Sequence, residues 1–233
     1  MRALLLDRTH HVLVTERGLP EIPLDGPRLI NAVDAHFARL GITLPYAAGS
    51  RPSPDGGRDF AFVIDRVAAP PGHTWKPLRE VSGDDALWSL YVAVMLGGYE
   101  PPVRAVDVWS FGDKPEMAAQ LVHLVVNGQK RATMGWVDAA EREGTPLAYQ
   151  DGVSVVTDGF GYPRCVVRST DVRVHAFRDV PPSSAAAEAE GDLTYEDWRE
   201  GHADYFTREA ARLGLTFDDS ARISVEHFEV LWP

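Results

Sequence analysis

An Asp-Gly pair at positions 158 and 159 lies between two valine-rich runs, VSVVT and PRCVVR, and no other feature constrains the fold as strongly. Asp-Gly favours the left-handed backbone of the tight turn that joins two antiparallel strands. Valine, which is branched at Cβ, suits a pleated strand. The sequence therefore predicts a β-hairpin over residues 153–168 and an antiparallel sheet in this half of the chain.

A helix is predicted before this hairpin. Asp113 and Glu116 have the spacing of a capping box, and Asn127-Gly128 has the composition of a helix end. The inner face of the helix is expected to consist of four apolar side chains: Met117, Leu121, Leu124 and Val125. A short strand is expected to begin near Ala132.

After the hairpin, residues 171–177 alternate like a half-buried strand, with Val172, Val174 and Ala176 expected to point inward. Residues 180–192, rich in proline and serine, are expected to form a long loop. A helix is predicted from Tyr195 to Leu213, and a closing strand over residues 223–232. This order of elements predicts a small barrel with helices against its ends.

The residues before 97 predict a separate, smaller α/β module. Periodicity indicates two strands over 2–7 and 11–16, a helix over 28–41, a strand over 60–68 and a second helix that ends at Gly97. The Gly-Gly and Pro-Pro pairs that follow break regular structure and mark a linker. The expected protein is of the α+β class, with a module over residues 1–96, a linker over 97–105 and a second domain over 106–233.

The net charge of −11 bears on the class of partner. Residues 103–233 hold 22 Asp and Glu but 13 Lys and Arg, a net charge of −9. Extended binding to nucleic acid depends on many cationic contacts with phosphates, so this charge disfavours a wide footprint on DNA or RNA. A small, locally positive cleft remains compatible with it.

No apolar run is long enough to cross a membrane, and the first residues lack the pattern of a secretory signal, so a cytoplasmic location is expected. The single cysteine, Cys165, lies in an apolar run and is expected to be a buried thiol. The eight histidines have no metal-ligand spacing, so neither a metal nor another cofactor is expected. The oligomeric state is left open.

The stretch NGQKRATMGW, residues 127–136, places two adjacent cations between the end of a helix and the start of a strand. Cations near a helix C-terminus are favoured by the helix dipole, so a structural role for Lys130 and Arg131 is one interpretation. The other is that Lys130 faces a substrate, with a hydroxyl nearby at Thr133.

Residues 106–233 resemble the ASCH family. The resemblance is carried by WSFGDKPEMAAQLVHLVVNGQKRAT at 109–133, RCVVRSTDVRVHAF at 164–177 and EAEGDLTYEDWREGHADYF at 188–206, with FEVLWP at the end. It implies a PUA-like β-barrel with flanking helices. It also implies nucleoside or RNA chemistry, because bacterial members include an amidohydrolase that acts on N(4)-acetylcytidine, an enzyme described as a ribonuclease, and RNA-binding modules.

In that amidohydrolase a lysine acts as the base, a threonine three residues later is the nucleophile, and a downstream glutamate is the proton donor. The resemblance implies these roles for Lys130, for Thr133, and for Glu190 or Glu188. A lysine becomes a base near neutrality only where burial or a nearby cation such as Arg131 disfavours its charge. Because lysine is rarely buried without a partner, we expect Lys130 to lie outside the core, close to the segment 188–192.

Four further residues are candidates for contact with a substrate: Arg131, Trp136, Trp198 and His202. Aromatic rings beside a cleft can stack on a base. Each candidate also has a structural interpretation. The tryptophans suit the core, and His202, four residues after Trp198 on the same helical face, suits a packed, hydrogen-bonded position. Glu188 and Glu190 equally suit a solvated acidic loop.

The order of elements in residues 1–96 resembles a shortened Nudix domain. Members of that family hold Mg²⁺ through glutamates on a helix, since Mg²⁺ prefers carboxylate oxygen ligands. When the closing Gly-apolar pair of the family is placed on Gly41-Ile42, Ala38 and Arg39 stand where the two glutamates belong. Neither side chain can bind Mg²⁺, so the resemblance implies a degenerate domain without catalysis.

The expected function is binding of a nucleoside or a short RNA by the second domain. Whether the protein is an enzyme is left open. One hypothesis is an amidohydrolase acting on an acylated pyrimidine nucleoside such as N(4)-acetylcytidine. The alternatives are a module that binds RNA or a modified nucleotide without chemistry, and a ribonuclease, which the net charge favours least.

Overall fold

A computed structural model of the chain describes residues 3–8, 11–15, 22, 29–45, 49–52, 58–81, 85–103 and 107–233. The chain divides into two compact units, one made of residues 1–118 and 155–164 and the other of residues 119–154 and 165–233. The expected domain bounds, with a linker at 97–105, stay a prediction, because compactness does not show which segments fold independently.

The first unit contains a five-stranded sheet of mixed direction. Its strands have the order β3-β4-β1-β2-β5, and their bounds are β1 (Ala3–Asp7), β2 (His11–Thr15), β3 (Gly49–Pro52), β4 (Arg58–Ile64) and β5 (His73–Pro77). β1 pairs antiparallel with β2 and parallel with β4. This sheet and its helices confirm the expected small α/β module.

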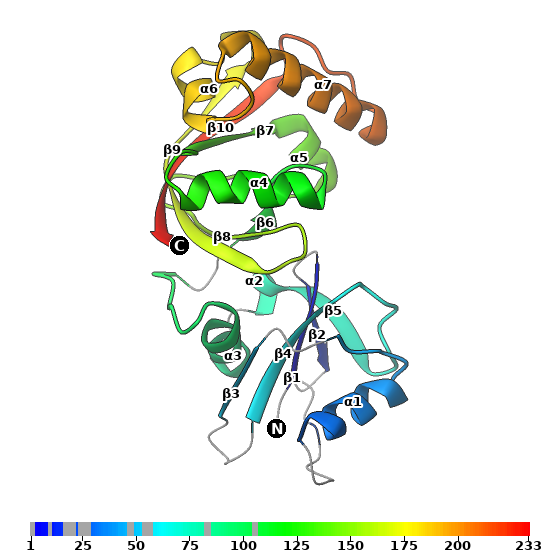
Figure 1. The fold of residues 1–233 in the computed structure, drawn as a ribbon. Helices are drawn as coiled ribbons and strands as arrows, with labels where there is room; N and C mark the ends of the chain where they lie inside the picture. Colours follow the sequence, from blue (N-terminus) through cyan, green and yellow to red (C-terminus); the bar gives the residue numbers. More distant parts are fainter. Residues whose placement is uncertain are drawn as a thin grey trace. The chain divides into compact units, whose positions relative to one another are not determined.

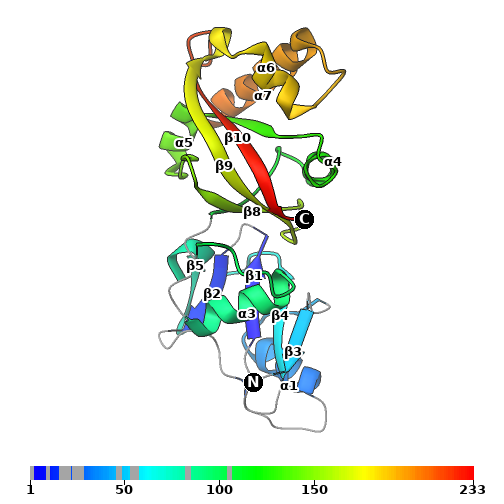
Figure 2. The same cartoon turned by 90° about the vertical axis from the view of Figure 1, so that its left-hand side faces the viewer.

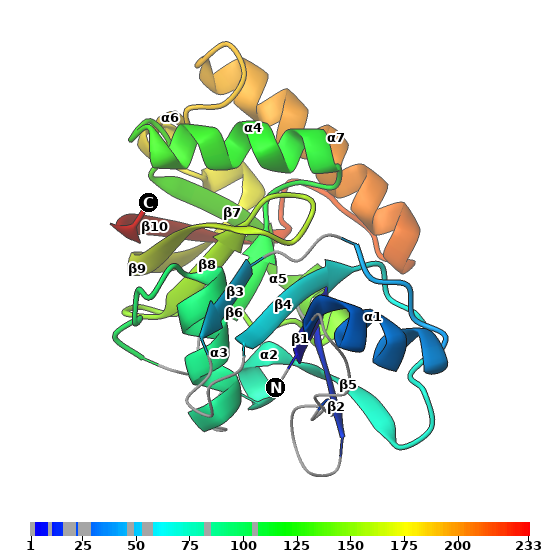
Figure 3. The same cartoon turned by 60° about the horizontal axis from the view of Figure 1, so that its bottom comes forward.

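Two helices, α1 (Leu29–Arg39) and α3 (Asp85–Met95), lie on opposite faces of this sheet (Figures 2 and 3), and a short helix α2 (Leu78–Val81) follows β5. Val33 and Phe37 of α1 pack into a core that includes Leu5, Leu13 and Phe62. One face of α1 therefore packs into the core, as periodicity predicts. Ala38 and Arg39 at its end are exposed.

The second sheet is curled into a half-barrel. Its order is β6-β8-β9-β10-β7, with β6 (Asp107–Ser110), β7 (Ala132–Trp136), β8 (Val153–Thr157), β9 (Pro163–Ala176) and β10 (Arg222–Trp232). In this sheet β10 pairs antiparallel with both β9 and β7. The predicted hairpin is present as β8 and β9. β9 and β10 run side by side as a long pair (Figure 2). The sheet and its flanking helices confirm the expected α+β class and the PUA-like architecture.

Helices flank this sheet. They are α4 (Pro115–Val126), α5 (Val137–Glu143), α6 (Pro182–Glu188) and α7 (Tyr195–Leu213), with a 3-10 turn η1 (Phe177–Asp179). α6 and α7 lie over β7 and β10 (Figure 1). The core beneath them is mostly aromatic and branched, and includes Trp136, Phe177, Trp198, Phe206 and Ile223. Among the helices described, none combines the length and the apolar character that crossing a lipid bilayer requires.

Several expectations about the second half were wrong. Met117, expected on the inner face of α4, is 37% exposed, and the buried residues of that helix are Ala118, Val122 and Val125. The expected loop over 180–192 contains α6, because Pro182 suits the first helical position and a run of alanines favours the turns that follow. Val174 is 55% exposed instead of pointing into the core. Val172, Val174 and Ala176 do share a face, but their partners on β10 are Glu226, Ser224 and Arg222. Alternation identifies the two faces of a strand and not which of them is buried.

The expected burial of Cys165 is confirmed, since its side chain has no exposed surface. Burial raises the pKa of the thiol to about 12, against a small opposing effect of the Arg131 charge. A thiol that stays protonated is a poor nucleophile, because the thiolate is the reactive form. Cys165 is therefore a core residue.

Candidate functional site

The turn after α4 fixes the position of Lys130. Gly128 adopts a left-handed backbone with φ of +82°, which glycine accepts without a Cβ clash. The Lys130 N–H donates to the carbonyl of Leu124 at 3.1 Å, and the Arg131 N–H donates to the carbonyl of Ala187 in α6 at 2.7 Å. The backbone is therefore held on both sides of Lys130, next to the end of α6.

The ammonium group of Lys130 is enclosed between two carboxylates. Its Nζ lies 3.0 Å from Oε1 of Glu188 and 2.5 Å from Oε1 of Glu190, and the residue is 0% exposed. The expected proximity to the segment 188–192 is confirmed. The expectation that Lys130 lies outside the core is wrong, because two opposite charges compensate the cost of burying it.

Glu188 is the most buried carboxylate of this group, with 2% of its side chain exposed. Its Oε2 accepts a hydrogen bond from Trp198 Nε1 at 2.6 Å and lies 3.0 Å from His202 Nε2. Burial alone would raise the pKa of Glu188, but the Lys130 charge and the contacts with His202 and Trp198 lower it to about 2. Glu188 is therefore ionised at neutral pH and satisfied on both oxygens.

Both ring nitrogens of His202 face acceptors. Nε2 lies 3.0 Å from the Glu188 carboxylate, and Nδ1 lies 3.0 Å from the carbonyl of Trp198. Burial lowers the pKa of His202, but the hydrogen bond and charge of Glu188 outweigh it, and the net effect is a raised pKa. The expectation of a packed, hydrogen-bonded histidine is confirmed, and its ring also stacks on Trp198.

Glu190 is the carboxylate of this group that reaches the surface, with 26% of its side chain exposed. It follows Ala189, whose backbone is left-handed at φ of 54° and ends α6. The next residue, Gly191, has φ of +61°, and a Cβ there would lie 1.8 Å from Oδ2 of Asp197. The left-handed backbone favours glycine, and any other residue would also displace the Asp197 carboxylate. The segment that carries Glu190 is therefore held tightly against the start of α7.

Thr133 lies on the other face of β7. Successive side chains of a strand alternate, and the neighbours Ala132 and Trp136 face the helices, so the Thr133 side chain faces away from them. Its partner on β10 is Glu226, which is 6% exposed and accepts a hydrogen bond from Ser169 Oγ at 2.6 Å. Sequence reasoning missed Glu226 and Ser169. The sequence does offer one signal, because Glu226 is a carboxylate at a position of the closing strand that alternates with the apolar residues Val225 and Ile223.

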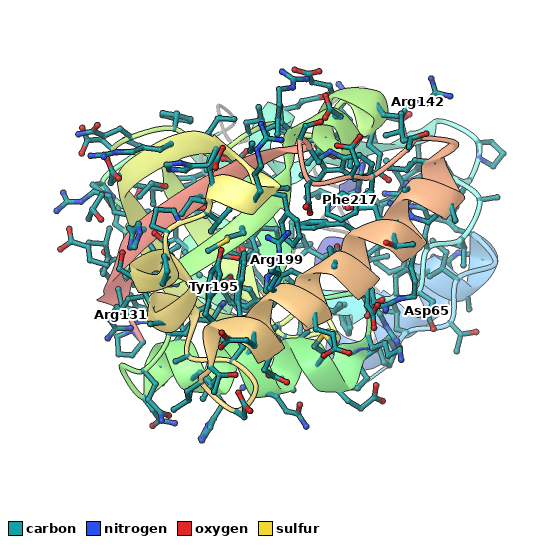
Figure 4. The ribbon with its side chains drawn as sticks, turned by 90° about the horizontal axis from the view of Figure 1, so that it is seen from above. Asp65, Arg131, Arg142, Tyr195, Arg199 and Phe217 are labelled. Atoms are coloured by element: carbon teal, nitrogen blue, oxygen red, sulfur yellow. The ribbon has the colours of Figure 1, made fainter. Side chains whose placement is uncertain are left out.

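Arg131 and Trp136 make structural contacts. Arg131 Nη1 donates to the carbonyls of Val125 at 3.0 Å and Lys130 at 2.9 Å, at the end of α4. Trp136 is 3% exposed and donates its Nε1–H to Asp138 at 3.0 Å. In Figure 4, Arg131 lies at the end where α6 meets α7, whereas Phe217, which packs on Trp136, lies toward the opposite end.

Five of the eight predicted site residues thus meet in one cluster, which we call the Lys130 cluster: Lys130, Glu188, Glu190, Trp198 and His202. With His202 protonated, it contains two cations and two anions. Arg131, Trp136 and Thr133 make their contacts elsewhere. In the part of the chain that the structure describes, no group of three or more His, Cys, Asp and Glu side chains is arranged to hold a metal ion.

The half of the chain that contains the Lys130 cluster matches a known family. The model of the ASCH domain family matches residues 107–232. The chain belongs to the ASCH family. An ASCH domain from Lactobacillus crispatus JV V101 is 26% identical with a TM-score of 0.55, and the match covers 62% of this chain and 94% of that one. Protein EF3133 from Enterococcus faecalis V583 is 30% identical with a TM-score of 0.53, covering 64% and 87%. A search among curated proteins finds no significant match.

Membership of the ASCH family confirms the expected resemblance of the second half. The family has the PUA-like fold, and its domains bind RNA or nucleotides in general. The family match does not extend to residues 1–106, so the interpretation of the first module as a degenerate Nudix domain stays a prediction.

Proposed function

We propose that the ASCH domain binds a nucleoside, either free or as an unstacked base of a short RNA, through the carboxylate of Glu190. The observation that supports this proposal is the division of the Lys130 cluster into an enclosed cation and a partly exposed anion. Lys130 is 0% exposed, whereas the Glu190 side chain is 26% exposed. A ligand at the surface of the cluster therefore meets a carboxylate first.

A carboxylate accepts hydrogen bonds and repels phosphate. Ionised Asp and Glu side chains suit the N4 amino group of cytosine and, by the same chemistry, other base edges that present N–H donors. One oxygen of Glu190 already accepts from Lys130 at 2.5 Å, which fixes its orientation before a ligand arrives. Such pre-organisation lowers the entropy that binding costs.

The net charge supports a neutral ligand. Residues 103–233 carry 22 acidic against 13 basic side chains. The Lys130 ammonium has no exposed surface for a phosphate, and the Arg131 guanidinium donates to two backbone carbonyls. A nucleoside needs no phosphate contact, whereas a long RNA needs several.

The test is the affinity of the full chain for cytidine, guanosine and uridine, measured by calorimetry. Cytidine should bind more tightly than uridine, which lacks the N4 amino group. Glu190→Gln should weaken cytidine binding by about tenfold or more, because hydrogen bonds to charged groups contribute about 1.5–3 kcal/mol. Glu200→Gln, at an exposed glutamate on α7, is the matched control. Equal affinity of wild type and Glu190→Gln, or no binding of any nucleoside, would contradict the proposal.

A second candidate function is hydrolysis of an acyl amide on such a nucleoside. It is favoured by the hydrogen bond between a proton donor, Lys130, and a carboxylate acceptor, Glu190, which are the group types that amide hydrolysis requires. An ammonium that donates to two carboxylates has no lone pair to accept a proton. If the reaction occurs, Glu190 is therefore the better base, the reverse of the roles that the resemblance implies.

The assay for this candidate is the conversion of N(4)-acetylcytidine to cytidine and acetate. Because the Thr133 side chain faces away from the Lys130 cluster, turnover at Glu190 should survive Thr133→Ala and be lost in Glu190→Gln. Wild type that binds cytidine but releases no acetate would remove the hydrolase candidate and leave the binding function in place.

A further inference from the structure

His202 stands behind the group that we propose to meet the ligand. A continuous series of contacts joins the two: His202 Nε2 to Glu188 Oε2 at 3.0 Å, Glu188 Oε1 to Lys130 Nζ at 3.0 Å, and Lys130 Nζ to Glu190 Oε1 at 2.5 Å. His202 is on α7, Glu188 ends α6 and Lys130 precedes β7. The proton of His202 is thus linked to the partly exposed carboxylate of Glu190 through the buried charges of Glu188 and Lys130.

The hydrogen bonds of His202 require the imidazolium form. Its neighbours at Nδ1 and Nε2 are a carbonyl oxygen and a carboxylate oxygen, and both of these can only accept. A neutral imidazole has one N–H, so its second nitrogen would direct a lone pair at an oxygen. The imidazolium, which donates from both nitrogens, satisfies both contacts.

We propose that protonated His202 is a positioning residue, which keeps Lys130 paired with Glu190 and so holds the Glu190 carboxylate in place. While His202 is charged, it neutralises Glu188 and leaves the Lys130 charge for Glu190. Once His202 loses its proton, the Lys130 ammonium faces the two carboxylates without the charge of the imidazolium. The ammonium is then drawn toward the more buried Glu188, and the Glu190 carboxylate loses its fixed orientation.

The charged groups that act on His202 come from outside its own helix. Glu188 contributes from α6, Glu190 from the segment after it, and both favour the proton on His202. Lys130, from the turn before β7, acts on Glu188, the carboxylate that contacts His202, and lowers its pKa. His202 is 15% exposed on its side chain, so it can exchange its proton with solvent. Because its pKa is raised, the imidazolium persists above pH 6.5 and is lost as the pH rises through the folded-state value.

The consequence for ligand binding rests on the proposed function. From about pH 5 upward, affinity for cytidine should stay constant until His202 begins to deprotonate, and should fall as it does. Coupling between two linked sites is commonly worth a factor of about 5–150, so the affinity is expected to fall by at least about fivefold. His202→Gln keeps one donor but cannot titrate, and its affinity should not change with pH in this range.

The experiment is an NMR titration of the full chain, with and without cytidine. The imidazole nitrogens of His202 and the side-chain carboxyl carbon of Glu190 are followed between pH 5 and 10, in wild type, His202→Gln and the control His123→Gln, an exposed histidine on α4. We expect the Glu190 resonance to shift with the midpoint of His202 in wild type and the control, and not in His202→Gln.

A Glu190 resonance that does not move at the His202 midpoint would overturn the positioning role, even if cytidine binds. A resonance that moves in a protein that binds no nucleoside would overturn the proposed function and leave the positioning role intact. Binding with an affinity independent of pH would show that the position of Glu190 has no effect on the ligand, and would also overturn the inference.

Discussion

Replacing Lys130 with methionine should destabilise the protein strongly. Methionine has a similar length and no charge, so Lys130→Met removes the ammonium with little change in packing. Glu188 and Glu190 would each lose a hydrogen bond, and Glu188 has 2% of its side chain exposed to water. Removing one partner of a buried ion pair costs about 3–5 kcal/mol.

That cost is a large share of the stability of an ordinary domain, which is about 5–15 kcal/mol. For a chain of this size, each kcal/mol shifts Tm by about 2–4 °C, so Lys130→Met should lower Tm by about 6–20 °C. The change should appear in thermal and urea unfolding of the full chain. Lys114→Met, at an exposed lysine just before α4, is the matched control and should unfold like wild type.

A further variant separates lost charge pairing from lost packing. Adding Glu188→Gln and Glu190→Gln to Lys130→Met removes the uncompensated charges and should recover part of the lost stability, because neutral partners cost less to bury. If the free energy of unfolding of Lys130→Met lies within about 0.5 kcal/mol of wild type, the range usual for surface substitutions, then the enclosed ion pair does not exist in solution.

Three other perturbations have defined outcomes. Trp198→Phe keeps an aromatic ring but removes the donor to Glu188 at 2.6 Å, and should cost about 1–3 kcal/mol in urea unfolding. Because the pKa of Glu188 is lowered from 4.5 to about 2, the stability that its ionised form adds to the fold is complete above pH 4.5 and is lost as the pH falls toward 2. Glu188→Gln should therefore flatten the acid side of a curve of stability against pH, and an unchanged acid side would refute this. Gly191→Ala forces a Cβ to 1.8 Å from Asp197 in a left-handed backbone and should lower Tm, whereas Gly201→Ala, in open space on α7, should not.

Much of the fold follows from local patterns. The hairpin of β8 and β9, the helix from Tyr195 to Leu213 and the closing strand are all predicted by local patterns, and the structure has them. The left-handed residue of the hairpin loop is Gly161 and not the predicted Asp158-Gly159 pair. α6 escaped prediction because seven residues give too short a period, and proline and serine suggest a loop. The direction of Val174 was wrong because alternation does not say which face is covered.

The sequence predicted which residues belong to the candidate site but not how these residues are arranged. The resemblance pointed to Lys130, Glu188 and Glu190, which do meet. Their burial depends on contacts between residues 58 and 60 positions apart, and no local pattern encodes it. His202 was predicted to be packed, but its link to Glu188 needs the crossing of α6 and α7. Glu226 was missed because a glutamate in a strand usually faces solvent.

The dependence of affinity on salt tests most directly whether the domain reads a base or a phosphate backbone. The affinity of a short cytidine-rich RNA is measured from 50 to 400 mM salt, beside cytidine itself. For single strands the slope of log K against log salt is about −0.7 per phosphate contact. Recognition through Glu190 predicts a slope no steeper than about −0.7 for the RNA and near zero for cytidine, with both affinities reduced in Glu190→Gln. A slope of about −3 or steeper, unchanged in Glu190→Gln, would mean four or more phosphate contacts and would contradict base recognition by this carboxylate.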